Sequence, residues 1–345
     1  MHIAALYNSE KAAGALLKAK EIDVNVATSF LPPLRLAVSS YNNKVVEVLC
    51  KERPDIINAK NKDGEAPLHE AACGRNTNIL NVLIKSGADI DAVNEFGDTP
   101  LRRAVGHKRE EVVNILIENG ANVNTIGRGG YAPLHLAVKN NYVRIVNSLL
   151  KREDIKINIV GGDGETPLHK AAARGYIEVV DALLKAEGIN VNAVYTPYLW
   201  TPLHCATRNG HIDIVRALIE KEANPLLKDA YGRTPGDLAA NDSIKNLLKE
   251  AEEKRLRKQN KGTSNSEKTE PTSAIAKGVV AGGIVAALGT AVAVALFATG
   301  AIAVELVPIL IAVVAVTVAA LAVGGATYVL SKPSVEKVTG NERKV

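Results

Sequence analysis

The hydrophobic positions of residues 1–253 recur with a regular period. Seven prolines mark it at spacings of 34, 33, 33, 34, 35 and 33 residues: Pro33, Pro67, Pro100, Pro133, Pro167, Pro202 and Pro235. Each Pro except Pro235 is followed by Leu, and paired apolar positions come further along each unit. Apolar residues three and four positions apart form one face of a helix. The pattern therefore predicts short helix pairs that stack as a solenoid, each unit burying its apolar face against its neighbours.

The residues around each Pro predict how these helices begin. Four units carry a Thr whose hydroxyl is expected to cap the following helix: Thr99, Thr166, Thr201 and Thr234. The Pro at the first helical position loses no hydrogen bond, because an N–H at that position would have no partner within the helix. Five units carry a Gly three residues before Pro, where a turn with positive φ is expected: Gly64, Gly97, Gly130, Gly164 and Gly232. Phe30 and Leu199 stand at that position in two other units, so irregular turns are expected there.

Residues 278–330 show a different pattern, with Glu305 as their one charged residue. The two uncharged stretches, 278–304 and 306–330, are each long enough to cross a hydrocarbon core of about 30 Å as a helix. Lys and Arg flank both outer ends, so we expect a hairpin of two transmembrane helices with both termini cytoplasmic. A buried helix pair in a soluble protein is the alternative. Residues 254–277 are expected to form a basic polar linker or the end of a cap helix, and 331–345 a basic cytoplasmic tail.

Charge and cysteine content exclude several classes of protein. The excess positive charge lies in residues 254–345, because residues 1–253 hold 31 basic and 32 acidic side chains. This balance argues against a nucleic-acid partner. Three cysteines at long, unequal intervals, Cys50, Cys73 and Cys205, form neither a disulfide framework nor the paired spacing of a zinc site.

The repeated segments resemble the ankyrin repeat. The segments that match the ankyrin pattern are APLHEAA (66–72), APLHLAV (132–138), TPLHKAA (166–172) and TPLHCAT (201–207). The second helix of a unit is expected to end in a segment such as LIKSGADID (83–91). The resemblance implies an all-α ankyrin-repeat solenoid of helix-turn-helix units with hairpin turns. It covers 1–253 as a partial N-terminal unit (1–26), six full repeats and a C-terminal cap. It also implies a concave face that recognises another protein.

Four histidines recur at the repeat spacing and resemble a metal or catalytic array: His69, His135, His169 and His204. Packed helices stand about 8 to 10 Å apart, whereas ligands of one zinc ion each lie about 2 Å from it. We therefore expect a structural role, with each His tying its repeat to the next turn. No nucleophile elbow, Walker loop or dinucleotide-binding loop occurs in the sequence, so we expect no enzyme, no cofactor and no metal.

Two sets of residues are candidates for partner binding. The first is an aromatic series located four or two residues before the repeat Pro: Phe96, Tyr131, Tyr198, Trp200 and Tyr231. These residues are either anchors of a protein interface or contacts that pack one turn against the next. The second is a set of inner-helix cations that would complement an acidic partner: Arg103, Lys170 and Arg208.

The sequence thus predicts a non-catalytic, membrane-tethered scaffold that binds another protein. It resembles membrane-anchored ankyrin proteins of host-associated intracellular bacteria, which implies an effector that acts on a host protein. A second interpretation is an oligomeric channel or pore whose hairpins associate through small residues such as Gly278 and Gly282. A third is a soluble ankyrin regulator, which requires that 278–330 does not insert into a membrane.

Overall fold

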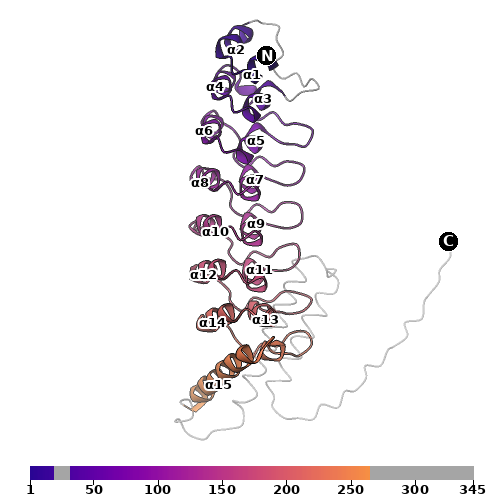
Figure 1. Cartoon of the computed structure of the whole chain (residues 1–345), viewed down its shortest axis with the longest axis vertical. Helices are drawn as coiled ribbons and strands as arrows, with labels where there is room; N and C mark the ends of the chain where they lie inside the picture. The colour runs from indigo at the N-terminus through magenta and orange to yellow at the C-terminus, as the bar shows by residue number, and fades with distance from the viewer. Residues whose placement is uncertain (19–31, 265–345) are drawn as a thin grey trace, which may run out of the picture. The chain divides into compact units, whose positions relative to one another are not determined.

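Short helices in two columns form the part of the chain that the structure describes (Figure 1). The computed structural model describes residues 1–18 and 32–264. The inner column, which lies beside the projecting loops, contains α3 (Pro33–Ser39), α5 (Pro67–Cys73), α7 (Pro100–Gly106), α9 (Pro133–Lys139), α11 (Pro167–Arg174) and α13 (Pro202–Arg208). The outer column contains α4 (Asn43–Glu52), α6 (Thr77–Lys85), α8 (Glu110–Glu118), α10 (Val143–Leu150), α12 (Ile177–Lys185) and α14 (Ile212–Glu220).

Further helices lie before, within and after these six pairs. The N-terminal pair is α1 (His2–Leu6) and α2 (Glu10–Leu17), and two 3-10 turns are η1 (Pro54–Ile56) and η2 (Gly236–Leu238). The last helix, α15, spans Asp242–Ser264 and packs through buried Ile244 and Leu248. It continues beyond residue 253 into the segment for which a linker or a helix end was predicted.

One continuous core runs through the stack. The Leu after each repeat Pro is buried, and so is an Ala three residues later, which leaves room for the outer helix to approach. Each inner helix contacts its outer partner and the next inner helix, as in the α5–α6 and α5–α7 pairs. Every repeat therefore depends on its neighbours for burial, as the period predicts.

The four predicted Thr residues all accept a backbone N–H with their hydroxyl oxygens, and three of them begin an α-helix. The hydroxyl oxygens of Thr99, Thr166 and Thr201 accept hydrogen bonds from the backbone N–H groups of Arg102, His169 and His204. Thr234 precedes the 3-10 turn η2, where its hydroxyl accepts from the backbone N–H of Asp237 at 3.4 Å and donates to the Asp237 carboxylate at 3.0 Å.

A ladder of side-chain hydrogen bonds joins consecutive repeats. The Nε2 atoms of the four histidines lie 3.0 to 3.3 Å from backbone carbonyl oxygens of the next repeat, those of Asp98, Glu165, Trp200 and Arg233. The two repeats that lack this His use Arg35 and Arg102, whose guanidinium groups donate to the carbonyls of Glu65 and Tyr131. The predicted structural role of the histidines is confirmed, and two arginines extend it.

The loop that joins each outer helix to the next inner element is called a finger here. The fingers comprise residues 53–66, 86–99, 119–132, 151–166, 186–201 and 221–235. The five predicted glycines all have positive φ, and backbone bonds such as Arg128 N–H to Phe96 O at 2.9 Å hold neighbouring fingers together. In the finger of residues 186–201, Leu199 takes the left-handed conformation with φ 54°, and Tyr195 pairs with Trp200 in an antiparallel bridge. The predicted irregularity is present there, whereas Phe30 lies outside the described residues.

The predicted hairpin of residues 278–330 also lies outside the described residues. Within 1–18 and 32–264, no helix combines the length and the apolar character that a bilayer span needs.

Candidate protein-interaction face

The aromatic series divides into two groups according to position within the finger. Four residues before Pro, the side chains of Phe96, Tyr198 and Tyr231 are exposed by 45%, 43% and 68%. Two residues before Pro, Trp200 is 8% exposed and Tyr131 is half-buried. The second position lies at the base of the finger, where its backbone carbonyl accepts the ladder hydrogen bond from the preceding repeat. The exposed rings of the aromatic series therefore all belong to the first group.

Trp200 anchors one finger to the next. Its indole Nε1–H donates to the Asp229 carboxylate at 3.2 Å, and Arg233 pairs with that same carboxylate at 2.8 Å. Burial alone would raise the pKa of Asp229, but the hydrogen bonds from Arg233, backbone N–H groups and Trp200 outweigh it and hold the pKa well below its usual range. Trp200 is thus part of a satisfied polar network inside the solenoid.

Tyr131 and Lys170 belong to a second network. The Tyr131 hydroxyl donates to Asp163 at 3.0 Å, and the Lys170 ammonium lies 5.0 Å from the Tyr131 ring centre. Lys170 pairs with Asp163 and, at 2.9 Å, with Glu165, and it is only 3% exposed. Burial lowers the pKa of Lys170, but the hydrogen bonds from its ammonium to these carboxylates, together with their negative charges, raise the pKa by more than burial lowers it, so the net shift is upward.

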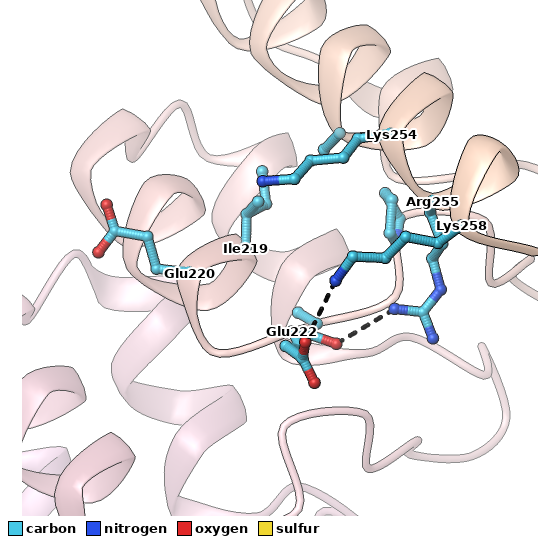
Figure 2. Close-up of a pocket in the computed structure, with 9 residues that line it drawn as sticks. Ile219, Glu220, Glu222, Lys254, Arg255 and Lys258 are labelled. Atoms are coloured by element: carbon cyan, nitrogen blue, oxygen red, sulfur yellow. Dashed lines mark hydrogen bonds and ion pairs between the residues drawn. The ribbon is translucent and has the colours of Figure 1, made fainter. Parts of the chain in front are cut away.

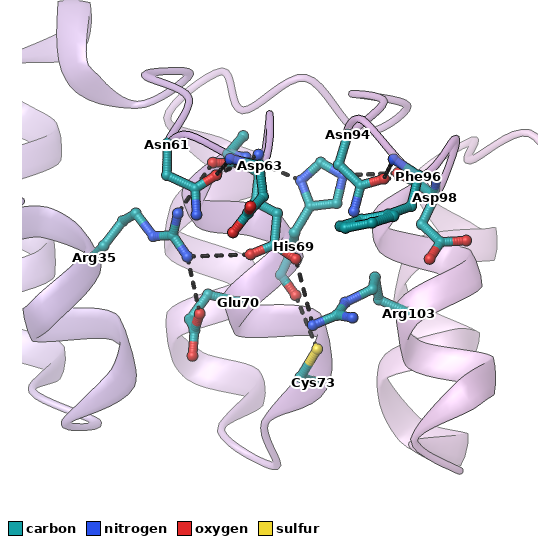
Figure 3. Close-up of polar contacts among 12 residues, drawn as sticks. Arg35, Asn61, Asp63, His69, Glu70, Cys73, Asn94, Phe96, Asp98 and Arg103 are labelled. Carbon is teal, nitrogen blue, oxygen red and sulfur yellow. Dashed lines mark hydrogen bonds and ion pairs between the residues drawn. The ribbon is translucent and has the colours of Figure 1, made fainter. Parts of the chain in front are cut away.

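A third network surrounds Arg103 near the N-terminal end of the stack, and Figure 3 shows its side chains. Arg103 pairs with Glu65 at 3.4 Å and lies against the Cys73 thiol. Arg35 pairs with Glu65 at 3.3 Å and with Glu70 at 3.2 Å. Two guanidinium groups from different repeats thereby share the Glu65 carboxylate, which joins three consecutive repeats.

Arg208 is placed differently from Arg103 and Lys170. It is exposed, its guanidinium carbon lies 4.8 Å from the Trp200 ring centre, and it pairs with no carboxylate among the described residues. The ring holds the guanidinium in place by a cation–π contact while leaving its charge unpaired. Of the three predicted partner-binding cations, Arg208 alone combines exposure with an unpaired charge.

The four ladder histidines are buried and bonded on both ring nitrogens. In each, Nδ1 lies 3.1 to 3.3 Å from the backbone N–H of the residue before the repeat Pro, so Nδ1 accepts there and Nε2–H donates to the next repeat. Burial lowers the pKa of all four imidazoles. Within the described ranges, no three His, Cys, Asp or Glu side chains gather into a metal-binding group.

Comparison with known proteins agrees with this architecture. The family model for ankyrin repeats (3 copies) matches five overlapping segments that together span 1–260: residues 1–94, 34–127, 75–161, 134–229 and 195–260. The chain belongs to the ankyrin-repeat family. Ankyrin repeats of this kind form a generally non-catalytic module for protein–protein interaction and imply a protein partner.

Comparison with solved structures supports the ankyrin fold but does not indicate which protein the chain binds. The crystal structure of the human ASB11 ankyrin repeat domain is similar, with 27% sequence identity and a TM-score of 0.52 over 64% of this chain and 97% of that chain. Altogether 584 chains of solved structures match, so the ankyrin fold alone cannot distinguish among partners. No curated protein sequence matches the chain significantly.

The structure also reveals exposed aliphatic residues that sequence reasoning missed. They lie in four consecutive ankyrin fingers and form what we call the aliphatic row: Val93, Ile126, Val160 and Val194. The first three stand seven residues before the repeat Pro, and the fourth stands eight residues before it. The sequence signal for this row is an aliphatic residue that recurs seven or eight positions before the repeat Pro.

A hollow of about 350 Å³ lies at the C-terminal end of the stack, between α14 and α15 (Figure 2). Ile219, Ala223 and Pro225 contribute its apolar lining. Two of its three cations, Arg255 and Lys258, reach the backbone oxygen and the carboxylate of Glu222 at 3.5 and 3.6 Å. The positive charge of the hollow is therefore partly neutralised by Glu222, which also lines it.

Proposed function

We propose that the ankyrin fingers bind another protein through their exposed apolar side chains. The observation that supports this proposal is the aliphatic row, which presents one exposed aliphatic side chain in each of four consecutive fingers. Exposed apolar side chains arranged in a contiguous row are a feature of interaction sites. The exposed aromatics Phe96, Tyr198 and Tyr231 add rings of the kind that serve as interface anchors.

The predicted role of Tyr131, Trp200, Arg103 and Lys170 in binding stays a prediction. Their contacts within the solenoid support the expectation that replacing them lowers stability before it changes affinity. Residues of the aliphatic row are the better sites for a binding test, because they contribute little to the core.

The test compares two double variants of the full-length protein. Ile126→Asp with Val160→Asp places charges in the row, whereas Ile177→Asp with Leu256→Asp places them at exposed positions on α12 and α15. Proximity labelling in cells should lose its specific protein neighbours with the first variant and keep them with the second. Unchanged neighbours for a folded Ile126→Asp/Val160→Asp protein would remove the fingers as the binding surface.

We further propose that residues 278–330 tether the solenoid to a membrane as two spans. The two uncharged stretches and their basic flanks support this proposal. The full chain should stay with membranes during alkaline carbonate extraction, whereas a chain that ends at Lys261 should be released. Release of both chains would contradict the tether.

The resemblance to membrane-anchored ankyrin proteins of intracellular bacteria adds the proposal that the partner is a host protein. Proximity labelling in an infected host cell should then identify host proteins. Labelling confined to proteins of the producing organism would contradict an effector role.

A further inference from the structure

Five exposed cations lie at the C-terminal ends of consecutive inner helices. We call them the cation row: Arg75, Lys108, Lys139, Arg174 and Arg208. Three are the last residues of α9, α11 and α13, and the other two follow the ends of α5 and α7 by two positions. Because consecutive inner helices are in contact, the row passes from repeat to repeat along the stack.

The cation row differs from the other inner-helix cations in its pairing. Arg35, Arg102, Arg103 and Lys170 each form an ion pair with a carboxylate. In the part of the chain that the structure describes, no member of the cation row pairs with a carboxylate. Two members are held over aromatic rings instead, Lys108 over Tyr142 at 5.3 Å and Arg208 over Trp200 at 4.8 Å.

We propose that the cation row binds an acidic segment of the partner protein, an inference that rests on the proposed function and specifies the chemistry of its partner. Packed helices stand about 8 to 10 Å apart, so the five charges extend over roughly 30 to 40 Å. An extended chain advances about 3.3 Å per residue, and a carboxylate at every third residue matches this spacing. Such a segment places one carboxylate near each inner helix.

The surrounding charges favour a protein over a nucleic acid. Glu110 and Glu111 line the same surface hollow, of about 450 Å³, as Arg75 and Lys108. A phosphate backbone carries a charge about every 3.4 Å along each strand and would meet these carboxylates between the cations. A protein segment can place neutral residues at those points. The solenoid as a whole is also electrically balanced, with 31 basic and 32 acidic residues in 1–253.

A purely structural role is the competing explanation, because a cation near a helix C-terminus stabilises the helix dipole. The chain contains a matched control for this role. Lys85 and Lys185 are exposed and end the outer helices α6 and α12, and neither has an ion-pair partner among the described residues. Reversing the charge of Lys85 and Lys185 changes the net charge by the same amount as reversing two members of the cation row. It also alters two helix C-termini in the same way, but in the outer column of helices.

The experiment measures fluorescence anisotropy of a labelled peptide with the purified full-length protein. The probe is a peptide of about 15 residues with Glu at every third position, and the reference peptide carries Gln in place of Glu. The protein variants are Lys139→Glu with Arg174→Glu, and Lys85→Glu with Lys185→Glu. Thermal unfolding of both variants is followed in parallel by circular dichroism.

We expect the Glu peptide to bind, the Gln peptide to fail, and the Lys139→Glu/Arg174→Glu variant to bind at least about tenfold more weakly than the parent. The Lys85→Glu/Lys185→Glu variant should stay within about twofold of the parent at equal thermal stability, and raising NaCl to about 0.5 M should weaken binding of the parent. Equal losses in both variants, equal binding of both peptides, or tighter binding of a single-stranded oligonucleotide would overturn the inference.

The same variants separate this inference from the proposed function. Suppose that the captured partner is lost with Ile126→Asp/Val160→Asp but retained with Lys139→Glu/Arg174→Glu. The fingers would then remain the binding face, and the acidic-segment inference alone would fall. Retention of the partner by both variants would overturn both.

Discussion

Mild acid should destabilise the solenoid through its four ladder histidines. His69, His135, His169 and His204 are buried, and each accepts a backbone N–H at Nδ1 while donating from Nε2. A second proton would have to bind Nδ1, which faces a backbone donor. The folded protein therefore holds all four in the neutral form.

The direction and size of the effect follow from proton linkage. Burial lowers the folded-state pKa of each His, while the unfolded chain regains the ordinary value of 6.5. The free energy of unfolding is thus unaffected well above pH 6.5, decreases as the pH falls through 6.5, and levels off below the folded-state pKa. Between about pH 7.5 and 5.5 the loss is at most about 1.4 kcal/mol for each His and at most about 5.5 kcal/mol for the four, the limit that applies if the folded state binds no proton on them.

The assay is urea unfolding followed by far-UV circular dichroism at about pH 7.5 and 5.5. His169→Gln removes one titrating group while keeping a donor for the Trp200 carbonyl, so the loss between the two pH values should shrink by about one quarter. His107 is exposed, and His107→Gln should change the pH dependence less.

Two results would refute this reasoning. Equal stability at both pH values would mean that the folded state accepts the protons without cost. A pH dependence unchanged by His169→Gln would assign the acid sensitivity to other groups.

Three further expectations concern packing and reactivity. Leu134→Ala should lower the free energy of unfolding by about 2 to 5 kcal/mol because its side chain is fully buried, and a change within about 0.5 kcal/mol would place it on the surface. Gly162→Ala should lower the melting temperature because the new Cβ would meet the Gly129 carbonyl oxygen, whereas Gly106→Ala has open space and should be neutral or better. Burial raises the pKa of Cys205 to about 12, so iodoacetamide at about pH 8 should modify half-buried Cys73 first, as mass spectrometry can check.

The sequence by itself determined the features that depend on local geometry and on the repeat period. Thr166 caps its helix because the acceptor and the donor are three residues apart in the sequence. Gly130 adopts positive φ because the turn requires it, and the repeat places that turn three residues before Pro. The His ladder was also predictable, since the same residue type recurs at the same place in four repeats. Such interactions recur wherever the motif recurs.

Only the tertiary structure decided which repeated side chains remain available to a partner. Lys170 and Arg208 both lie on inner helices, yet Lys170 is buried against the carboxylates of Asp163 and Glu165, while Arg208 stays exposed above Trp200. The outcome depends on side chains that differ from one repeat to the next, and on how closely adjacent fingers approach. The repeat period defines a position in the solenoid, but the neighbours packed around that position determine its exposure and its charge balance.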